Sequence, residues 1–276
     1  MTSQEREDGT FDPSPLTLLL GTSKTTEYAP QTFKTKYTGT KPLLVVCTDT
    51  GGMEMANGKT FNTGNHPVEM LVPMLHFRDA GFTFDIATPT GKPVVMEMWA
   101  FPTKDQNVID LQKSIQADLD DPKKLSEIPN VDAYAGIFIP GGHGAMISLP
   151  ESIDLGRLLR EAHVQKLPTI TLCHGPAALL ATKTNGNKFA YSSYEAFCFT
   201  DKTDEATPGY GYLPGPMPWK CQECLEKEGL KITNTTETGG VHTDRELITG
   251  DSPSAANNLG VIAAPILLKH ALEEDK

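Results

Sequence analysis

Apolar residues along this chain fall into two alternating patterns from residue 43 onward. Short, nearly continuous apolar runs, typical of strands that are covered on both faces, occur at 43–48, 82–88, 134–139 and 169–172. Longer stretches with helical spacing of apolar positions occur at 68–80, 153–165 and 176–182. Strands that alternate with helices in this way favour βαβ units. The pattern therefore predicts an α/β fold in which a mostly parallel sheet is sandwiched between helices in three layers.

The remaining segments divide the chain into an arm, a domain and two insertions. Residues 1–40, rich in Thr, Ser, Pro and Lys without a sustained period, predict an extended N-terminal arm. Residues 41–276 would then form a single α/β domain. The stretches near 91–131 and 185–220 do not fit the alternation, so we expect insertions that cap a site at the carboxyl ends of the strands.

Two local features predict a final helix after residue 251. Ser252 can cap this helix and Pro253 suits its first position, ahead of an apolar stripe at 259–266. Pro265 lies inside the stripe, which predicts a kink at that point.

Charge and composition narrow the partners that we expect. The formal net charge is −11, and no stretch combines clustered basic residues with aromatic ones, so we expect no nucleic acid as a partner. No apolar run approaches the roughly 18 to 20 residues that span a bilayer, so we expect no membrane either. The first residues carry acids and prolines in place of a signal-peptide pattern, which makes the cytoplasm the expected location.

The segment 168–181, PTITLCHGPAALLA, carries the strongest indication of chemistry. It predicts a buried strand, a sharp turn at Cys173 and His174, and a helix of small residues. Backbone N–H groups at a helix start favour a thiolate, which lowers the pKa of a thiol from its free value of about 8.5. Cys173 is therefore our candidate nucleophile, with an inert buried thiol as the alternative.

Two further segments would lie beside this turn. IPGGHG at 139–144 is a glycine turn whose backbone N–H groups can point at an oxyanion. In NTGNHPVE at 62–69, Pro67 begins a helix and places Glu69 in its first turn. A solvated charge at a helix end is the alternative interpretation of Glu69.

Several motifs occur in a fixed order along the chain: NTGNHPVE, WAFPTKD, IPGGHGAMISLPES, TLCHGPAALLA, GYGYLPG and LITGDSPSAAN. In these motifs the chain resembles the PfpI-type, class I glutamine-amidotransferase-like superfamily. It is most similar to the branch of heat-shock-protein-31 chaperones and glutathione-independent glyoxalases (glyoxalase III). The resemblance runs from about residue 43 to the C-terminus and implies a flavodoxin-like fold.

The resemblance implies a role for each candidate residue. It makes Cys173 the nucleophile, His174 its partner, and Asp204 in FTDKTDEA the acid that orients the histidine. It places the Glu69 carboxyl beside the sulfur. The oxyanion hole would consist of the backbone N–H groups of Gly142 and His174.

The choice of Asp204 and the protonation of Glu69 each require a separate argument. Asp201 and Glu205 lie close to Asp204 in sequence, and only the register of the motif favours Asp204. For Glu69, a helix N-terminus favours the anion by about 0.3 to 1 kcal/mol. A thiolate about 4 Å away opposes that anion by about 4 kcal/mol at an effective dielectric constant of 20. We therefore expect Glu69 and Cys173 to share one proton and to titrate as a unit.

We expect no metal and no other cofactor. Bacterial chaperone-like members of this branch hold a metal with two histidines and one carboxylate, and the corresponding positions here are Arg78, Thr83 and Ile115. A guanidinium, a hydroxyl and an aliphatic side chain do not form a zinc site. Nothing in the sequence groups the remaining histidines at ligand spacing, among them His66, His76 and His143.

The cysteines outside the elbow are expected to be structural. The chain has 5 cysteines, an odd and scattered set that is typical of reduced thiols. Cys221 and Cys224 form a CxxC pair, but no second pair exists and the surrounding segment 219–228 predicts an amphipathic helix.

The activity that the resemblance implies is a glyoxalase III reaction, in which methylglyoxal and water give D-lactate without glutathione. Cys173 would add to the aldehyde as a hemithioacetal, and His174 or Glu69 would move a proton between the two carbons through an enediol. The expected partners are small dicarbonyls such as methylglyoxal and glyoxal, and the expected assembly is a homodimer. The alternatives are a stress-induced holding chaperone, and a protein deglycase or cysteine peptidase.

Overall fold

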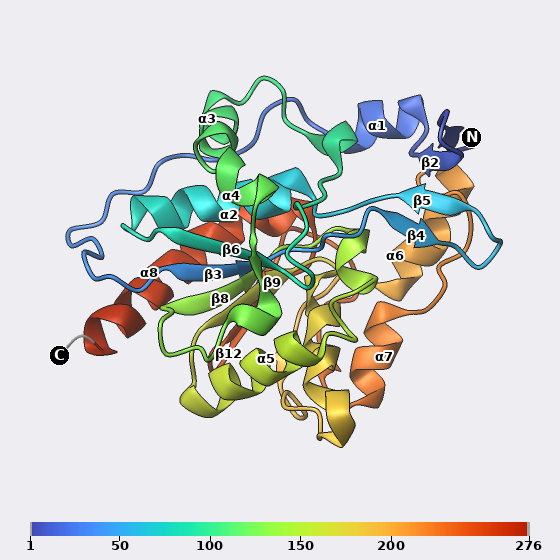
Figure 1. Cartoon of the computed structure of the whole chain (residues 1–276). Helices are drawn as coiled ribbons and strands as arrows, with labels where there is room; N and C mark the ends of the chain where they lie inside the picture. Colours follow the sequence, from blue (N-terminus) through green and yellow to red (C-terminus); the bar gives the residue numbers. More distant parts are fainter. Residues whose placement is uncertain (1, 275–276) are drawn as a thin grey trace.

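The computed structural model describes residues 2–274, and their main feature is a central seven-stranded sheet (Figure 1). Its strands are β3 (Leu43–Val46), β6 (Phe84–Thr88), β7 (Lys123–Lys124), β8 (Gly136–Ile139), β9 (Thr169–Leu172), β12 (Val241–Asp244) and β13 (Leu247–Gly250). The strand order is β12-β13-β9-β8-β3-β6-β7. Only β12 pairs in the antiparallel direction among these strands, so the sheet is mostly parallel, as predicted.

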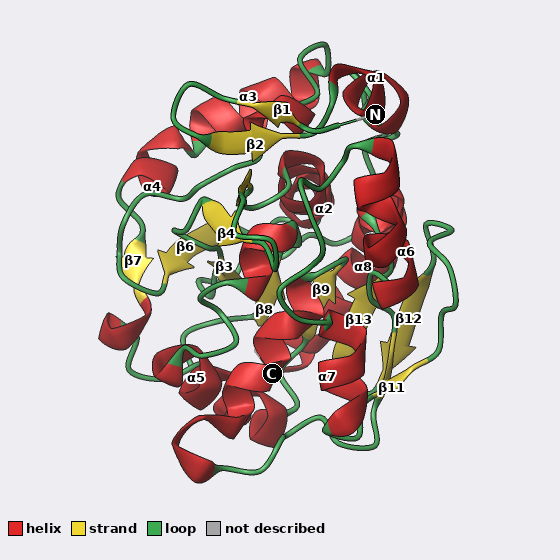
Figure 2. Ribbon diagram, turned by 90° about the vertical axis from the view of Figure 1, so that its right-hand side faces the viewer, coloured by secondary structure: helices red, strands yellow, loops and turns green. Residues whose placement is uncertain are grey.

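Helices cover both faces of this sheet and complete three layers (Figures 1 and 2). On one face pack α2 (Pro67–Asp79), α3 (Gln106–Ser114), α4 (Gln116–Asp120) and α8 (Ala256–Glu274). On the other pack α5 (Ile153–Gln165), α7 (Cys221–Lys227) and the 3-10 helix η4 (Gly175–Gly186). Because both faces are covered, every residue of β3, β8 and β9 is buried. The predicted fold class is confirmed.

The C-terminal helix differs from the prediction at its start. A short 3-10 turn, η6 (Pro253–Ala255), precedes α8, and the Ser252 hydroxyl donates to Asp251 Oδ1 at 2.6 Å without capping the helix. The α-helix continues through Pro265 to residue 274. Neither α8 nor any other helix among residues 2–274 is long and apolar enough to cross a membrane.

The first 40 residues are not simply an extended arm, which corrects that prediction. They contain β1 (Gln4–Glu5), β2 (Thr10–Asp12) and α1 (Pro15–Gly21). Strand β2 pairs with β5 (Thr60–Asn62), which also pairs with β4 (Gly52–Glu54), in a separate small sheet. The Ser14 hydroxyl caps α1 by accepting from the Thr17 N–H at 3.2 Å. The Thr17 hydroxyl in turn donates to the Tyr210 carbonyl at 2.6 Å, which ties α1 to the 3-10 helix η5 (Thr207–Tyr210). This helix directly follows α6 (Asp201–Ala206), and α1 lies near α6 in Figure 2.

The two unusual stretches meet at the carboxyl ends of the strands. The stretch 91–131 contains η1 (Met98–Ala100), α3, α4, η2 (Leu125–Glu127) and also β7, which lies at the edge of the main sheet. The stretch 185–220 contains β10 (Glu195–Ala196), α6 and η5 (Thr207–Tyr210), and β10 pairs with β11 (Lys231–Ile232). Trp99 of the first stretch and Tyr212 of the second lie edge to face, with ring centroids 5.8 Å apart.

Candidate active site

Cys173 lies on a tight turn directly after β9. Its φ of 58° is in the left-handed region, which only a few non-glycine residues adopt and which often marks functional sites. Gly175 is required in this turn, because a Cβ there would lie 2.2 Å from Thr171 Oγ1 and 2.8 Å from the Ile139 carbonyl oxygen. The segment therefore has the predicted strand, elbow and helix, although the helix η4 is of the 3-10 type.

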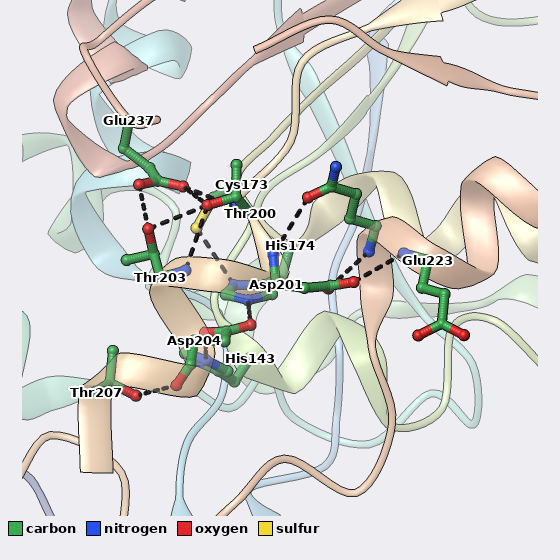
Figure 3. Close-up of polar contacts among 11 residues, drawn as sticks. His143, Cys173, His174, Thr200, Asp201, Thr203, Asp204, Thr207, Glu223 and Glu237 are labelled. Atoms are coloured by element: carbon green, nitrogen blue, oxygen red, sulfur yellow. Dashed lines mark hydrogen bonds and ion pairs between the residues drawn. The ribbon is translucent and has the colours of Figure 1, made fainter. Parts of the chain in front are cut away.

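The structure brings the predicted nucleophile, histidine and acid into one hydrogen-bonded row (Figure 3). Cys173 Sγ lies 3.4 Å from His174 Nδ1, and His174 Nε2 lies 2.8 Å from Asp204 Oδ2. Asp204 comes from the short helix α6, which Thr200 caps. All three side chains are at most 4% exposed.

The two competing acids have other partners. The Asp201 carboxylate accepts from the backbone N–H groups of Gln222 and Glu223 at the start of α7, at 3.0 and 2.8 Å. Glu205 forms an exposed ion pair with Lys220. Geometry therefore places Asp204, and neither neighbour, next to His174.

His143 is a fourth member of this row and corrects the expectation that no histidines are grouped. Its Nε2 lies 3.0 Å from Asp204 Oδ1, and its ring packs on that of His174 with centroids 4.0 Å apart and an interplanar angle of 35°. Burial lowers the pKa of His143, and the nearby His174 lowers it further. Burial alone would raise the pKa of Asp204, but the two histidines outweigh it and hold that pKa well below its usual range.

These charges determine which nitrogens carry protons. Ionised Asp204 is acceptor only, so it accepts N–H bonds from Nε2 of both rings. The tautomer of His174 with its proton on Nε2 has a lone pair on Nδ1, the nitrogen that faces the Cys173 sulfur. The arrangement provides a proton acceptor for the thiol.

Glu69 lies beside Cys173 in the buried first turn of α2, not at a solvated helix end. It is fully buried, and neither of its carboxyl oxygens has a hydrogen-bond partner among the described residues. A Cβ on Gly141 would lie 2.0 Å from Glu69 Oε2 and 2.8 Å from Cys173 Cβ, so only glycine leaves room for this approach. Burial raises the pKa of Glu69 well above its usual value.

The prediction of a lowered thiol pKa is wrong. Burial raises the pKa of Cys173 well above its ordinary value, and the nearby Glu69 raises it further. The Gly142 N–H acts in the opposite direction and favours negative charge on the sulfur, but it does not outweigh burial. Ionised Glu69 and ionised Cys173 would oppose each other, so a proton shared by the two groups remains our prediction. The thiol therefore depends on a neighbouring base for its activation.

The glycine turn at the predicted oxyanion hole packs tightly against the loop before α2. Gly142 has a φ of 99°, and a Cβ on it would lie 2.4 Å from the Gly64 carbonyl oxygen. The turn leads into η3 (His143–Met146) and places the Gly142 N–H near the sulfur. The N–H groups of Gly142 and His174 remain our predicted oxyanion donors.

A cavity of about 460 Å³ lies beside this site. Its lining includes Phe199, whose ring centroid is 4.8 Å from that of His174, but not Cys173, Glu69 or Asp204. Aromatic side chains from three parts of the chain line it, together with His66 and leucines of α1: Trp99, Phe199, Tyr210 and Tyr212. The contribution of α1 was not predicted. The cavity is small and largely apolar, as expected for a site that takes a small organic molecule.

Glu97 is a buried acid that the sequence analysis did not select. It is 1% exposed, and its Oε1 accepts from the Thr63 hydroxyl at 2.6 Å. Burial raises the pKa of Glu97 to about 7. Its motif, WAFPTKD with the preceding MEM, gave no local sign of burial, because the contacts come from residues more than thirty positions away.

The positions of the family's metal site do not fit a metal in this chain. Arg78 is in the last turn of α2, Thr83 precedes β6, and Ile115 is a buried aliphatic side chain between α3 and α4. A guanidinium and an aliphatic group offer no ligand atom for zinc. Within residues 2–274, the only His, Cys, Asp and Glu atoms close enough for a shared ion belong to His143, His174 and Asp204. Those atoms already bond one another through ring N–H groups.

Comparison with known proteins identifies relatives over most of the chain. A profile of the DJ-1/PfpI family matches residues 61–197. The protein/nucleic acid deglycase HchA of Pseudomonas aeruginosa (strain UCBPP-PA14) is 43% identical over 276 residues, which cover 97% of this chain and 95% of the relative. The protein of the same name from Escherichia coli O157:H7 is 42% identical over 266 residues, covering 95% and 93%.

Solved structures share the fold. The 24 kDa rapid encystment protein of Francisella tularensis superposes with a TM-score of 0.70 at 20% identity, covering 82% of this chain and 99% of that one. Glyoxalase III from Candida albicans superposes with a TM-score of 0.64 at 22% identity, covering 82% and 97%.

These relatives are named protein/nucleic acid deglycases, which contradicts our expectation that nucleic acid is not a partner. That expectation rested on the net charge of −11 and the lack of a basic stretch. These features exclude only tight binding that neutralises many phosphates. They do not exclude an enzyme that makes brief contact with one modified group on a nucleic acid.

Proposed function

Because the chain belongs to the DJ-1/PfpI family, we propose that it is a cysteine-dependent enzyme for 2-oxoaldehydes, with the reaction of a glutathione-independent glyoxalase III (D-lactate dehydratase). The observation that carries the proposal is the buried row of Cys173, His174 and Asp204 beside Glu69. These groups supply a nucleophile, an oriented proton acceptor and a second carboxyl next to a small cavity.

The first step uses Cys173 and His174. The thiol proton moves to His174 Nδ1, the sulfur bonds to the aldehyde carbon of methylglyoxal, and the C=O electron pair becomes an alkoxide. The Gly142 N–H is the proposed donor to this alkoxide. Return of the proton from His174 to the alkoxide gives a neutral hemithioacetal.

The second step moves hydrogen between the two carbons. Glu69 removes the proton from the carbon that carries sulfur, the C–H electron pair forms a C=C bond, and the ketone oxygen takes the negative charge of an enediolate. Protonated Glu69 returns this proton to the neighbouring carbon. The hydroxyl on the sulfur-bearing carbon passes its proton to the enediolate oxygen, which leaves a thioester of lactate on Cys173. The raised pKa of Glu69 makes it a stronger base than an exposed glutamate, which suits the removal of a carbon-bound proton.

Water completes the reaction. It adds to the thioester carbon, the C–S bond breaks, and lactate and the thiol are released. One carbon of the substrate is oxidised while its neighbour is reduced, so atoms and electrons balance without a redox cofactor.

The burial of the nucleophile favours a small substrate over a peptide. Cys173 is 4% exposed and the adjoining cavity measures about 460 Å³, which suits a three-carbon dicarbonyl. A peptidase needs an open cleft along which an extended chain can reach the sulfur.

The name of the 43% identical relatives favours a second candidate, a deglycase for glycated proteins and nucleic acids. The same sulfur would add to the sugar-derived carbon of an adduct and release the amine. The site is common to both candidates, and they differ in the group that leaves.

Purified protein with methylglyoxal and no glutathione tests the proposal. We expect loss of methylglyoxal and an equal amount of D-lactate, measured with a stereospecific lactate dehydrogenase. Release of free amine from preformed glycated peptide or nucleotide, without turnover of methylglyoxal itself, would support the deglycase and contradict the glyoxalase.

A further inference from the structure

Glu97 is a second buried carboxyl near the proposed catalytic pair, and the proposed reaction gives it no role. One of its oxygens accepts from the Thr63 hydroxyl, whereas the other, Oε2, is buried without a hydrogen-bond partner in the described residues. Burying an unpaired carboxyl oxygen costs free energy. Packing alone therefore does not explain why a glutamate occupies this position.

A single peptide group connects the Glu97 backbone with the glycine turn beside Glu69. The Asn65 carbonyl accepts from the Glu97 N–H at 3.0 Å, and the His66 N–H of that same peptide donates to the Gly141 carbonyl at 2.9 Å. Gly141 in turn is the residue against which Glu69 Oε2 packs. The two carboxyls thus lie on neighbouring segments that are fixed relative to each other.

Burial is the main influence on the Glu97 carboxyl, and His143 and the Thr63 hydroxyl favour its ionised form. The titratable groups that act on it or respond to it are Glu69 from α2, His143 from η3 and Tyr212 from the second insertion. Burial favours the uncharged form of both His143 and Tyr212, because it lowers the pKa of the histidine and raises the pKa of the tyrosine. Of the three groups on which Glu97 acts, Glu69 is the one whose carboxyl lies beside Cys173.

We propose that Glu97 is a positioning residue that acts through Glu69, and that its charge determines how tightly Glu69 and Cys173 hold the proton between them. Negative charge on Glu97 opposes negative charge on the pair, so the pair keeps its proton to higher pH. The pKa of Glu97, about 7, means that this influence changes with pH in the neutral range. The proposal deepens the proposed function and rests on it only for the roles of Cys173 and Glu69.

The pH dependence of Cys173 alkylation by iodoacetamide measures this effect without substrate turnover. Glu97→Gln keeps an oxygen for the Thr63 hydroxyl and removes the charge, so the alkylation midpoint should move to lower pH by about one unit, as for loss of a neighbouring like charge. At a fixed pH below the midpoint, alkylation should become about tenfold faster. Glu97→Asp, which keeps the charge, should restore a midpoint close to that of the wild type.

Two further variants separate this role from structural support. Thr63→Val removes the hydroxyl that favours ionised Glu97, so it should move the midpoint in the same direction by a smaller amount. Glu127→Gln removes an exposed charge from the same insertion and should leave the midpoint unchanged. An unchanged midpoint in folded Glu97→Gln, or an equal shift in Glu127→Gln, would overturn the proposal. Because alkylation needs no dicarbonyl substrate, failure of the glyoxalase assay would leave this test intact.

Discussion

Replacement of Asp204 by Asn tests how the row of catalytic groups is oriented. The carboxylate has two acceptor oxygens, one for Nε2 of His143 and one for Nε2 of His174. An asparagine of the same shape offers only one oxygen, and its NH₂ group can only donate. One of the two rings must therefore lose its N–H acceptor.

The size of the effect follows from these contacts. Loss of one charge-assisted hydrogen bond costs about 1.5 to 3 kcal/mol, which corresponds to about tenfold to a hundredfold in rate when it is felt in the transition state. If His174 then changes its tautomer and carries its proton on Nδ1, the acceptor that faces Cys173 Sγ at 3.4 Å is lost as well. Loss of a positioned proton acceptor costs about 10² to 10⁴. We therefore expect kcat/KM to fall by at least about 10².

The assay is methylglyoxal consumption without glutathione, with a control on the same helix. Asp201→Asn removes the same charge from α6 but alters only the cap of α7. It should cost about 1 kcal/mol of stability and keep the activity within about twofold of the wild type. If folded Asp204→Asn is as active as Asp201→Asn, Asp204 does not orient His174 during the reaction and the reasoning fails.

Further predictions concern the carboxyl, the glycine turn, the buried histidine and metal. Glu69→Gln should lower kcat by at least about 10², measured in the same assay with thermal unfolding as the check on folding. Gly141→Ala places a Cβ 2.0 Å from Glu69 Oε2 and 2.5 Å from a backbone carbonyl oxygen, so both activity and melting temperature should fall. Burial lowers the pKa of His66 from 6.5 to about 3, so on acidification the unfolded chain binds a proton at this position before the folded chain does. The free energy of unfolding should therefore fall between pH 6.5 and 3. In thermal melts, His66→Gln should weaken this pH dependence. Prolonged treatment with a chelator should leave the activity unchanged. Elemental analysis of the treated protein should verify that no zinc remains.

The parts of the site that could be predicted from sequence are those with local features. An apolar run followed by Cys173, His174 and a glycine determines a strand and a turn within a few residues, so the elbow was accessible to sequence reasoning. Asp204 was found only through the register of its motif, because nothing nearby distinguishes it from Asp201. Distance in space to His174 decided between them.

The features that were missed depend on packing between distant segments. Glu97 is buried by Thr63 and its neighbours, and His143 meets Asp204 across 61 positions of sequence. The pKa of the Cys173 thiol is raised, whereas the sequence predicted a lowered value. Burial outweighs the effect of the backbone N–H group, and burial depends on the whole fold. For α1 a local sign existed, since Ser14 and Pro15 precede a leucine-rich stretch as at a helix start.

Turnover by two serine variants tests the central claim that Cys173 carries the chemistry. Cys173→Ser removes the buried elbow thiol, whereas Cys224→Ser removes a partly exposed thiol of α7. The two variants carry the same substitution and differ only in the position of the cysteine. With methylglyoxal and no glutathione, we expect D-lactate formation to be lost in Cys173→Ser and retained in Cys224→Ser. D-lactate formation at the wild-type rate by folded Cys173→Ser would contradict the account.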